Sequence, residues 1–262
     1  MHEWAGKVFL LISFGKLITN FFQANFEYIQ KGRKVLLKMH LRIFGHLFQL
    51  SKIQQHDSQS FTVTANEFSK NLLGLYEKGR HISILVVCSD NSSSSFIGSA
   101  MGNAVAAYHS LEKIRFYSGG ITSSRLNQDA IKVLEDIGFE IWESGEHAEC
   151  SKVENNPCFF VHWGKKETDG MLEFSKKIND LKNPNFRENF LGLMLCDKNE
   201  SRSDDFSLEG SKGTIYLVLE NQAINKAASI PLGDLVQLRD YLGSFMLATL
   251  GLVRDELDKA FK

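Results

Sequence analysis

A cysteine followed by a run of short polar residues is the stretch of this sequence best suited to chemistry. A turn of small polar residues can aim several backbone N–H groups at one point, and such a turn before a helix N-terminus binds anions. The same positive field favours a thiolate at Cys88. We therefore predict an anion-binding loop after Cys88, formed by Ser89, Asp90, Asn91, Ser92, Ser93, Ser94 and Ser95.

The segments on either side of this loop are predicted to be a strand and a helix. Residues 82–87 are nearly all apolar and rich in β-branched side chains, which is typical of a buried parallel strand. From Ser94 or Ser95 onward, apolar and small residues recur at the spacing of a helix that packs on a sheet. Cys88 would then lie at the carboxyl end of its strand, where parallel sheets bind their ligands.

The rest of the chain alternates between similar patterns. Further strands are predicted over residues 114–118, 139–142, 158–163, 190–196 and 214–219. A capping box at Thr64 opens a predicted helix that stops at Gly79, Asn127 caps one that Gly138 closes, and Asp234 caps the last. Strands alternating with helices indicate βαβ units, and hence an α/β fold with a parallel sheet.

The loop resembles that of a known enzyme family. Cys88, Asn91 and Ser95 fall on the pattern Cys-x-x-Asn-x-x-Arg-Ser, the phosphate-binding loop of low-molecular-weight protein-tyrosine-phosphatases and thioredoxin-coupled arsenate reductases. The order and spacing of elements over residues 65–258 is also similar, most of all to the longer arsenate-reductase-like bacterial members. The resemblance implies a three-layer α/β sandwich around a four-stranded parallel sheet over residues 64–262, with residues 1–55 as an extra N-terminal helical segment.

Several positions that carry catalysis in that family hold other residues here. Ser94 occupies the arginine position and Asn221 the general-acid position, with Glu220 beside it as a candidate substitute acid. Of the reductase's two relay cysteines, Cys196 matches the first, but Ser203 stands at the second. A neutral hydroxyl cannot replace a planar cation. The resemblance therefore implies a catalytically impaired member, a pseudoenzyme whose Cys88 loop binds phosphate, sulfate, an arsenate-type oxyanion or a phosphorylated protein.

An active enzyme is the alternative reading. A cysteine-dependent phosphatase, which is a hydrolase of phosphoric monoesters, or an arsenate reductase could work with rearranged helper residues. Glu220 would then supply the proton, and Arg125 or Arg202 the lost positive charge. Exposed arginines are more often simply solvated. The sequence leaves open whether the protein is an enzyme.

The N-terminal segment suggests a second alternative. Residues 1–55 carry eight Lys or Arg and two Glu, a net charge of +6, and residues 33–50 have the pattern of a basic amphipathic helix. Such a helix could lie on an anionic membrane or in a partner protein's groove. The simpler reading is a helical hairpin folded against its own domain. A signal peptide or a membrane span fits poorly, because Lys16 interrupts the apolar stretch over residues 4–29.

Overall composition excludes other classes of protein. A net charge of −1 and a pI near 6.7 argue against a nucleic-acid binder. The four cysteines, Cys88, Cys150, Cys158 and Cys196, lack the dense spacing of a disulfide scaffold, so we expect reduced thiols and a cytoplasmic protein, with peripheral membrane attachment as the variant.

We predict no cofactor and no metal. His147, Cys150, Cys158 and His162 could nominally supply four zinc ligands, but they lack a close Cys-x2-Cys pair. Ordinary strand and loop residues are therefore the favoured reading of these four positions.

Overall fold

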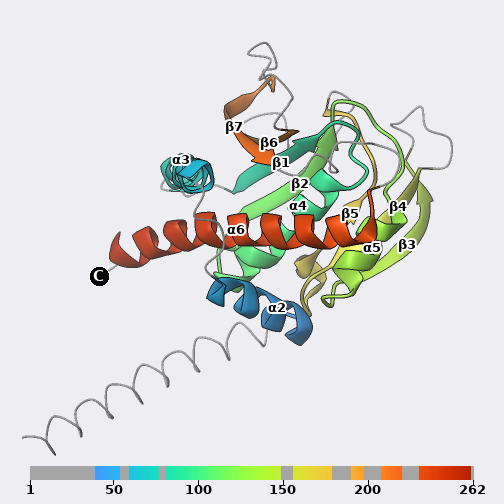
Figure 1. Ribbon diagram of the computed structural model, residues 1–262, viewed down its shortest axis with the longest axis horizontal. Coiled ribbons are helices and arrows are strands. Elements are labelled where there is room, and N and C mark those ends of the chain that lie inside the picture. Colours follow the sequence, from blue (N-terminus) through green and yellow to red (C-terminus); the bar gives the residue numbers. More distant parts are fainter. Residues whose placement is uncertain are drawn as a thin grey trace, which may run out of the picture.

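The computed structural model describes residues 39–53, 59–76, 81–148, 156–178, 190–197, 208–219 and 230–260. This part of the chain forms two sheets and five α-helices, whose arrangement can be followed in Figure 1. Their order is α2 (Leu41–Lys52), α3 (Gln59–Tyr76), β1 (Ile82–Cys88), α4 (Ser94–Tyr108), β2 (Ile114–Gly120), α5 (Gln128–Glu135), β3 (Glu140–His147), β4 (Pro157–His162), the 3-10 helix η1 (Glu167–Asp169), β5 (Gly170–Glu173), β6 (Phe190–Asp197), β7 (Ser211–Leu219) and α6 (Leu232–Ala260).

The larger sheet is parallel and four-stranded, in the order β2-β1-β6-β7. Its strands are the apolar runs that the sequence predicts, because a strand buried on both faces needs apolar residues at nearly every position. Cys88 pairs with Gly120, so the carboxyl ends of β1 and β2 lie side by side. The predicted α/β fold around a four-stranded parallel sheet is confirmed.

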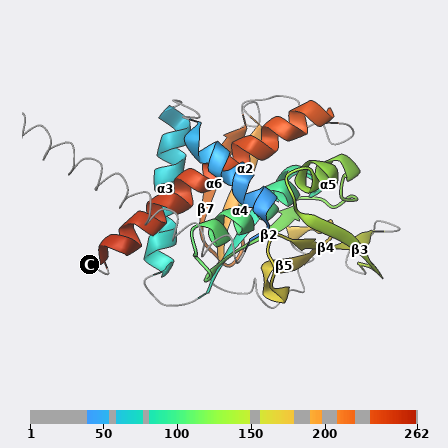
Figure 2. The same ribbon diagram turned by 90° about the horizontal axis from the view of Figure 1, so that it is seen from below.

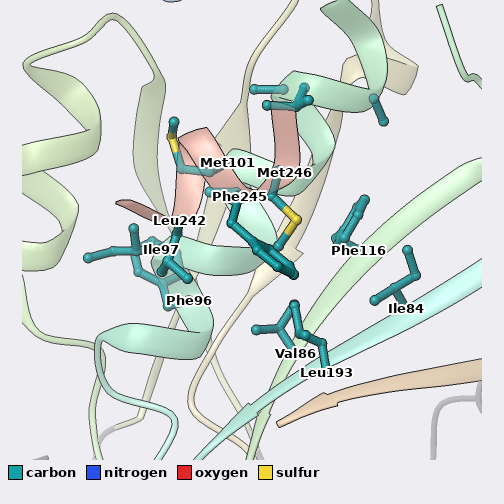
Figure 3. Packing of buried hydrophobic residues seen from close by; sticks show 14 of the residues in the cluster. Ile84, Val86, Phe96, Ile97, Met101, Phe116, Leu193, Leu242, Phe245 and Met246 are labelled. Carbon is teal, nitrogen blue, oxygen red and sulfur yellow. The ribbon is translucent and has the colours of Figure 1, made fainter. Parts of the chain in front are cut away.

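The core lies between this sheet and two of the helices. Figure 3 shows Phe245 of α6 and Phe96 of α4 in one cluster with Ile84, Val86 and Leu193 of the sheet. All five side chains are fully buried. Close contact between α4 and β2 needs a glycine at position 102, where an added Cβ would lie 2.5 Å from the Phe116 ring. Nearer the start of α4, an added Cβ at Gly98 would lie 2.9 Å from Val86 of β1, so this part of the helix lies close to β1.

The second sheet is antiparallel, with the order β3-β4-β5, and the sequence does not predict it. The predicted strands at residues 139–142 and 158–163 correspond to β3 and β4, but their pairing with each other and with β5 is new. In both ribbon views α5 lies on one side of this sheet (Figures 1 and 2). The segment that follows β5 returns to the parallel sheet, where the N–H of Gly120 donates to the carbonyl of Lys176 at 3.0 Å.

The helix α2 is built into the same core. Its apolar residues Ile43, Leu47 and Leu50 are buried in the main cluster. Two residues of its polar side bond to the rest of the molecule: Arg42 donates to the carbonyl of Asp136 at 2.5 Å, and His46 lies 3.0 Å from the carboxylate of Asp240. For this stretch the contacts favour packing on its own domain over packing on lipid.

Only part of the predicted N-terminal helices can be compared with the structure. The basic helix predicted over residues 33–50 begins at Leu41 within the described residues, because Met39 forms an isolated bridge with Gly164 instead. Residues 1–38 lie outside the described residues, and so does the apolar stretch 4–29. Within the ranges that the structure describes, no helix is both long and apolar enough to cross a membrane.

Two predicted helix starts are wrong and one is confirmed. α3 begins at Gln59, not at Thr64, because the extra turn buries Phe61 against Tyr241 and Phe245 of α6. α6 begins at Leu232, directly after a proline, which places Asp234 inside its first turn. Asn127 does cap α5, since its side chain accepts a 2.8 Å hydrogen bond from the N–H of Asp129.

Truncating Phe245 should test the position of the core. Phe245 is fully buried, and its ring packs against Phe61 and Phe68. We expect Phe245→Ala to lower the free energy of unfolding by about 3–5 kcal/mol, because a large cavity remains. The matched control Val63→Ala removes a 57% exposed side chain from α3 and should change it by less than about 0.5 kcal/mol. Urea unfolding measures both, and equal losses would contradict this core.

Candidate functional site

The sulfur of Cys88 lies between the end of β1 and the first turn of α4. Cys88 is 5% exposed, and its Sγ is 3.0 Å from the hydroxyl of Ser95. That hydroxyl also accepts a hydrogen bond from Asn91 Nδ2 at 2.9 Å. The sulfur is therefore buried, but it faces the polar loop through Ser95 and is not enclosed by aliphatic side chains alone.

Asn91 has an unusual backbone conformation. Its φ of 51° lies in the left-handed region, which costs little for asparagine compared with other non-glycine residues. Its side chain is fully buried and is held at both ends: Nδ2 donates to Ser95, and Oδ1 accepts the N–H of Lys176 at 2.8 Å. These two bonds fix the curvature of the loop.

A segment after β5 supports the loop, and no local pattern in the sequence predicts this contact. The hydroxyl of Ser175 donates to the carbonyl of Asp90 at 3.1 Å, and the N–H of Lys176 bonds to Asn91. On the β2 side, the N–H groups of Ile121 and Thr122 donate to the carbonyls of Cys88 and Ser89. Gly120 allows this approach, since an added Cβ would lie 2.3 Å from the carbonyl of Thr122 and 2.6 Å from the N of Asn91.

A buried ion pair lies behind this supporting segment. Lys176 Nζ is 2.6 Å from Glu173 Oε2, and the two side chains are 7% and 1% exposed. The hydroxyls of Ser118 and Ser99 donate to the same carboxylate at 2.7 and 3.3 Å. Lys176 is thus matched by a carboxylate of opposite charge. It does not supply an uncompensated positive charge to the loop.

The predicted anion-binding residues have different surroundings. The side chain of Asp90 accepts hydrogen bonds from both the N–H and the hydroxyl of Ser92, at 3.1 and 2.8 Å. These two donors therefore already have a partner. Ser93, Ser94 and Ser95 are all buried at the N-terminus of α4. Ser93, which precedes the helix, makes no side-chain capping bond. The N-cap residue of α4 therefore supplies no side-chain acceptor to the first turn, and the main-chain N–H of Ser95 bonds to the sulfur of Cys88 instead.

Burial raises the pKa of the Cys88 thiol above its ordinary value, and the negative charge of Asp90 raises it further. Hydrogen bonds from the hydroxyl and the main chain of Ser95, and from the main chain of Asp90, lower the pKa but do not offset burial. This direction of shift disfavours the expected thiolate, because burial disfavours the charged form of the thiol. Arg125 is exposed in the loop after β2 and is not among the groups that shift this pKa.

The relay position does not meet the Cys88 thiol. Cys196, on β6, packs against the cluster that includes Leu85 and Val87, whereas Cys88 belongs to the main cluster with Val86. The side chains of the two cysteines therefore lie on opposite faces of the parallel sheet. Cys88, Cys158 and Cys196 form no disulfide with one another.

Other predicted residues either lie apart or cannot be placed. Glu220, Asn221, Arg202 and Ser203 are outside the described residues, so their predicted roles stay predictions. Of the nominal zinc ligands, Cys150 is also outside them. Among the side chains that the structure does describe, no three His, Cys, Asp or Glu residues gather in a way that could hold a metal ion.

Alkylation should report the state of the Cys88 thiol. Because burial raises its pKa, Cys88 should stay protonated near pH 7 and react more slowly with iodoacetamide than the partly exposed Cys196. Its rate should rise only at pH values above the ordinary range of a thiol. Mass spectrometry of the labelled peptides measures both rates in one sample. Preferential labelling of Cys88 at pH 7 would contradict the assignment.

Lys176 and Glu173 should show a large coupling free energy in a double-mutant cycle of unfolding. Lys176→Met leaves the carboxylate of Glu173 buried and without its cation, so we expect a loss of about 3–5 kcal/mol in the free energy of unfolding. Adding Glu173→Gln removes the unpaired charge and should restore at least about 1 kcal/mol. Chemical denaturation of the two single variants and the double variant measures the cycle. Additive losses would show that the pair is not coupled.

This chain has only weak similarity to known proteins. No family model matches the chain, and no curated protein is significantly similar to it. A low-molecular-weight phosphotyrosine phosphatase from Vibrio cholerae O395 aligns with a TM-score of 0.38 and 14% identity, over 66% of this chain and 97% of its own. An arsenate reductase in the phosphate-binding state aligns with a TM-score of 0.38 and 16% identity, over the same shares. Similarity at this level does not assign the chain to a family.

Proposed function

We propose that this protein binds an oxyanion, or the phosphoryl group of a phosphorylated protein, at the Cys88 loop without using Cys88 as a nucleophile. The observation that carries the proposal is the buried N-terminus of α4, which begins with Ser94 and has no side-chain cap. An oxyanion there would accept first-turn N–H groups and stand in the favourable field of the helix. Asn91 keeps the loop curved around this position.

Three features oppose turnover by the sulfur. Burial raises the pKa of the thiol, which favours its neutral form, and a neutral thiol is a poor nucleophile. Ser94 offers no charge to a transition state. The buried lysine nearest to the loop in the described part of the chain is paired with Glu173. Losing a charged transition-state contact costs on the order of several kcal/mol, which is orders of magnitude in rate.

Features of the loop also limit its affinity for an oxyanion. Asp90 brings a negative charge into the loop and already occupies the N–H and hydroxyl of Ser92. Without an arginine, a bound dianion relies on neutral donors and the helix dipole alone. We therefore expect weak binding of a free oxyanion, with a dissociation constant of about 1 mM. A phosphorylated protein would bind more tightly by adding contacts outside the loop.

Calorimetric titration with phosphate, sulfate and arsenate tests binding, and p-nitrophenyl phosphate tests turnover. We expect wild-type protein and Cys88→Ser to bind alike, because the sulfur is not the main donor or acceptor. Gly120→Ala should abolish binding, because its Cβ would push against the loop backbone. The control Val63→Ala, on the distant α3, should bind as the wild type does.

Two outcomes would overturn this function. Hydrolysis of p-nitrophenyl phosphate, or reduction of arsenate by added dithiol, that disappears in Cys88→Ser would show an active cysteine enzyme. Anion binding that survives Gly120→Ala unchanged would place the anion elsewhere on the protein. Circular dichroism of each variant separates loss of binding from loss of fold.

A further inference from the structure

Asp90 places a negative charge close to both ends of the Cys88 loop. Its Oδ1 accepts hydrogen bonds from the N–H of Ser92 at 3.1 Å and from the Ser92 hydroxyl at 2.8 Å. That hydroxyl lies 3.5 Å from the hydroxyl of Ser93, the residue that precedes α4. At the other end of the loop, the charge of Asp90 raises the pKa of the Cys88 thiol. The carboxylate therefore acts on the whole loop.

Within the described ranges, no cation pairs with this carboxylate. The hydrogen bonds that its oxygens accept from described residues both come from Ser92. The buried Lys176, on the segment that supports the loop, is paired with Glu173 at 2.6 Å. Arg125 is exposed and Lys177 is half-exposed, so solvent screens their charges. The charge of Asp90 is thus left without a described counter-ion.

A buried hydroxyl at the start of α4 also has no partner in the described part of the chain. Ser94, the first residue of the helix, is 4% exposed, and its hydroxyl forms no hydrogen bond with another described residue. A buried polar group without a partner is costly, so such groups are usually bonded to protein, water or a ligand. This hydroxyl supports a ligand at the first turn, independently of the helix dipole.

Two electrostatic effects act on an anion bound at this turn, and they oppose each other. The dipole of α4, a helix of 15 residues, is equivalent to about +0.5 elementary charge at its N-terminus. Asp90 contributes a full negative charge. The N atoms of Ser92 and Ser94 are two residues apart, about 7 Å at most, so the carboxylate lies roughly within one Debye length of the turn.

The sum of these effects disfavours a highly charged ligand. Coulomb energy is proportional to the product of the two charges, so the repulsion from Asp90 doubles between a monoanion and a dianion. The dipole is about half as large as the charge of Asp90 and does not cancel this repulsion. A second negative charge on the ligand therefore weakens binding.

We propose that Asp90 makes the Cys88 loop select singly charged oxyanions, so that it takes a sulfate monoester in preference to the matching phosphate monoester. Both esters present three terminal oxygens in a tetrahedral arrangement. A sulfate monoester carries a single negative charge, whereas a phosphate monoester carries about −1.5 to −2 at pH 7. This inference rests on the proposed oxyanion site and names its ligand class. Asp90 is then the residue that determines specificity.

Titration of the 15N-labelled full chain with phenyl sulfate and phenyl phosphate at pH 8 tests the selection, with the amide resonances of the first turn of α4 as the readout. The wild type should bind phenyl sulfate about threefold more tightly. Asp90→Asn keeps an oxygen for the Ser92 donors but removes the charge. It should strengthen phenyl sulfate binding about threefold and phenyl phosphate binding about ninefold, because the repulsion scales with ligand charge. The preference should then disappear.

A matched control and a measurement without ligand separate local from general effects. Glu67→Gln removes an exposed carboxylate from α3 and should leave both affinities unchanged. Because the charge of Asp90 raises the pKa of Cys88, Asp90→Asn should lower that pKa and move the alkylation of Cys88 by iodoacetamide to lower pH. An unchanged pH profile would contradict the position of the carboxylate. Asp90→Ser, which also removes the charge, replaces Asp90→Asn if that variant does not fold.

Three titration results would overturn the selection and leave the oxyanion site intact. They are a wild type that binds phenyl phosphate as tightly as phenyl sulfate or more tightly, a preference that persists without the Asp90 charge, or equal strengthening of both esters by Asp90→Asn. If neither ester shifts these resonances in either protein, the proposed oxyanion site fails and the selection fails with it.

Discussion

The conformation of Asn91 is the constraint on which the candidate site depends. A left-handed residue between a strand and a helix turns the chain sharply, and the surrounding structure must hold it there. Asn91 is held by Ser95 from α4 and by the N–H of Lys176 from the segment after β5. The loop is therefore shaped by both sheets together. The geometry of the loop is part of the fold. Binding therefore does not have to supply the free energy of ordering the loop.

The contacts that shape the loop also lower the expected nucleophilicity of Cys88 and the positive charge available to an anion. Burial, which gives Asn91 and Ser95 their fixed positions, raises the pKa of the thiol beside them. The carboxylate of Asp90 takes donors that an anion would otherwise use, and Glu173 compensates the charge of Lys176. A preorganised loop with a raised thiol pKa, whose neighbouring buried lysine is paired with Glu173, suits the proposed binding better than phosphoryl transfer.

The sequence predicts what is local and misses what depends on distant contacts. The strand before Cys88, the helix after it and the cap at Asn127 follow from periodicity and residue type, and the structure confirms them. The support from Lys176 joins residues 85 positions apart, and the pairing of β3, β4 and β5 leaves no short-range signal. The sequence does not predict the raised pKa of Cys88, because the desolvation of its thiol depends on packing that the sequence does not display. Likewise, α3 begins early because Phe61 finds a place against α6.

We propose that the first turn of α4 binds an oxyanion and that Cys88 does not act as a nucleophile. The most direct measurement follows the backbone amide resonances of 15N-labelled protein during a sulfate titration. If the anion binds at the first turn of α4, we expect saturable shifts centred on Ser93, Ser94 and Ser95, with the same profile in Cys88→Ser. Shifts confined to surface lysines, or a phosphorylated Cys88 trapped after incubation with a phosphate ester, would contradict it.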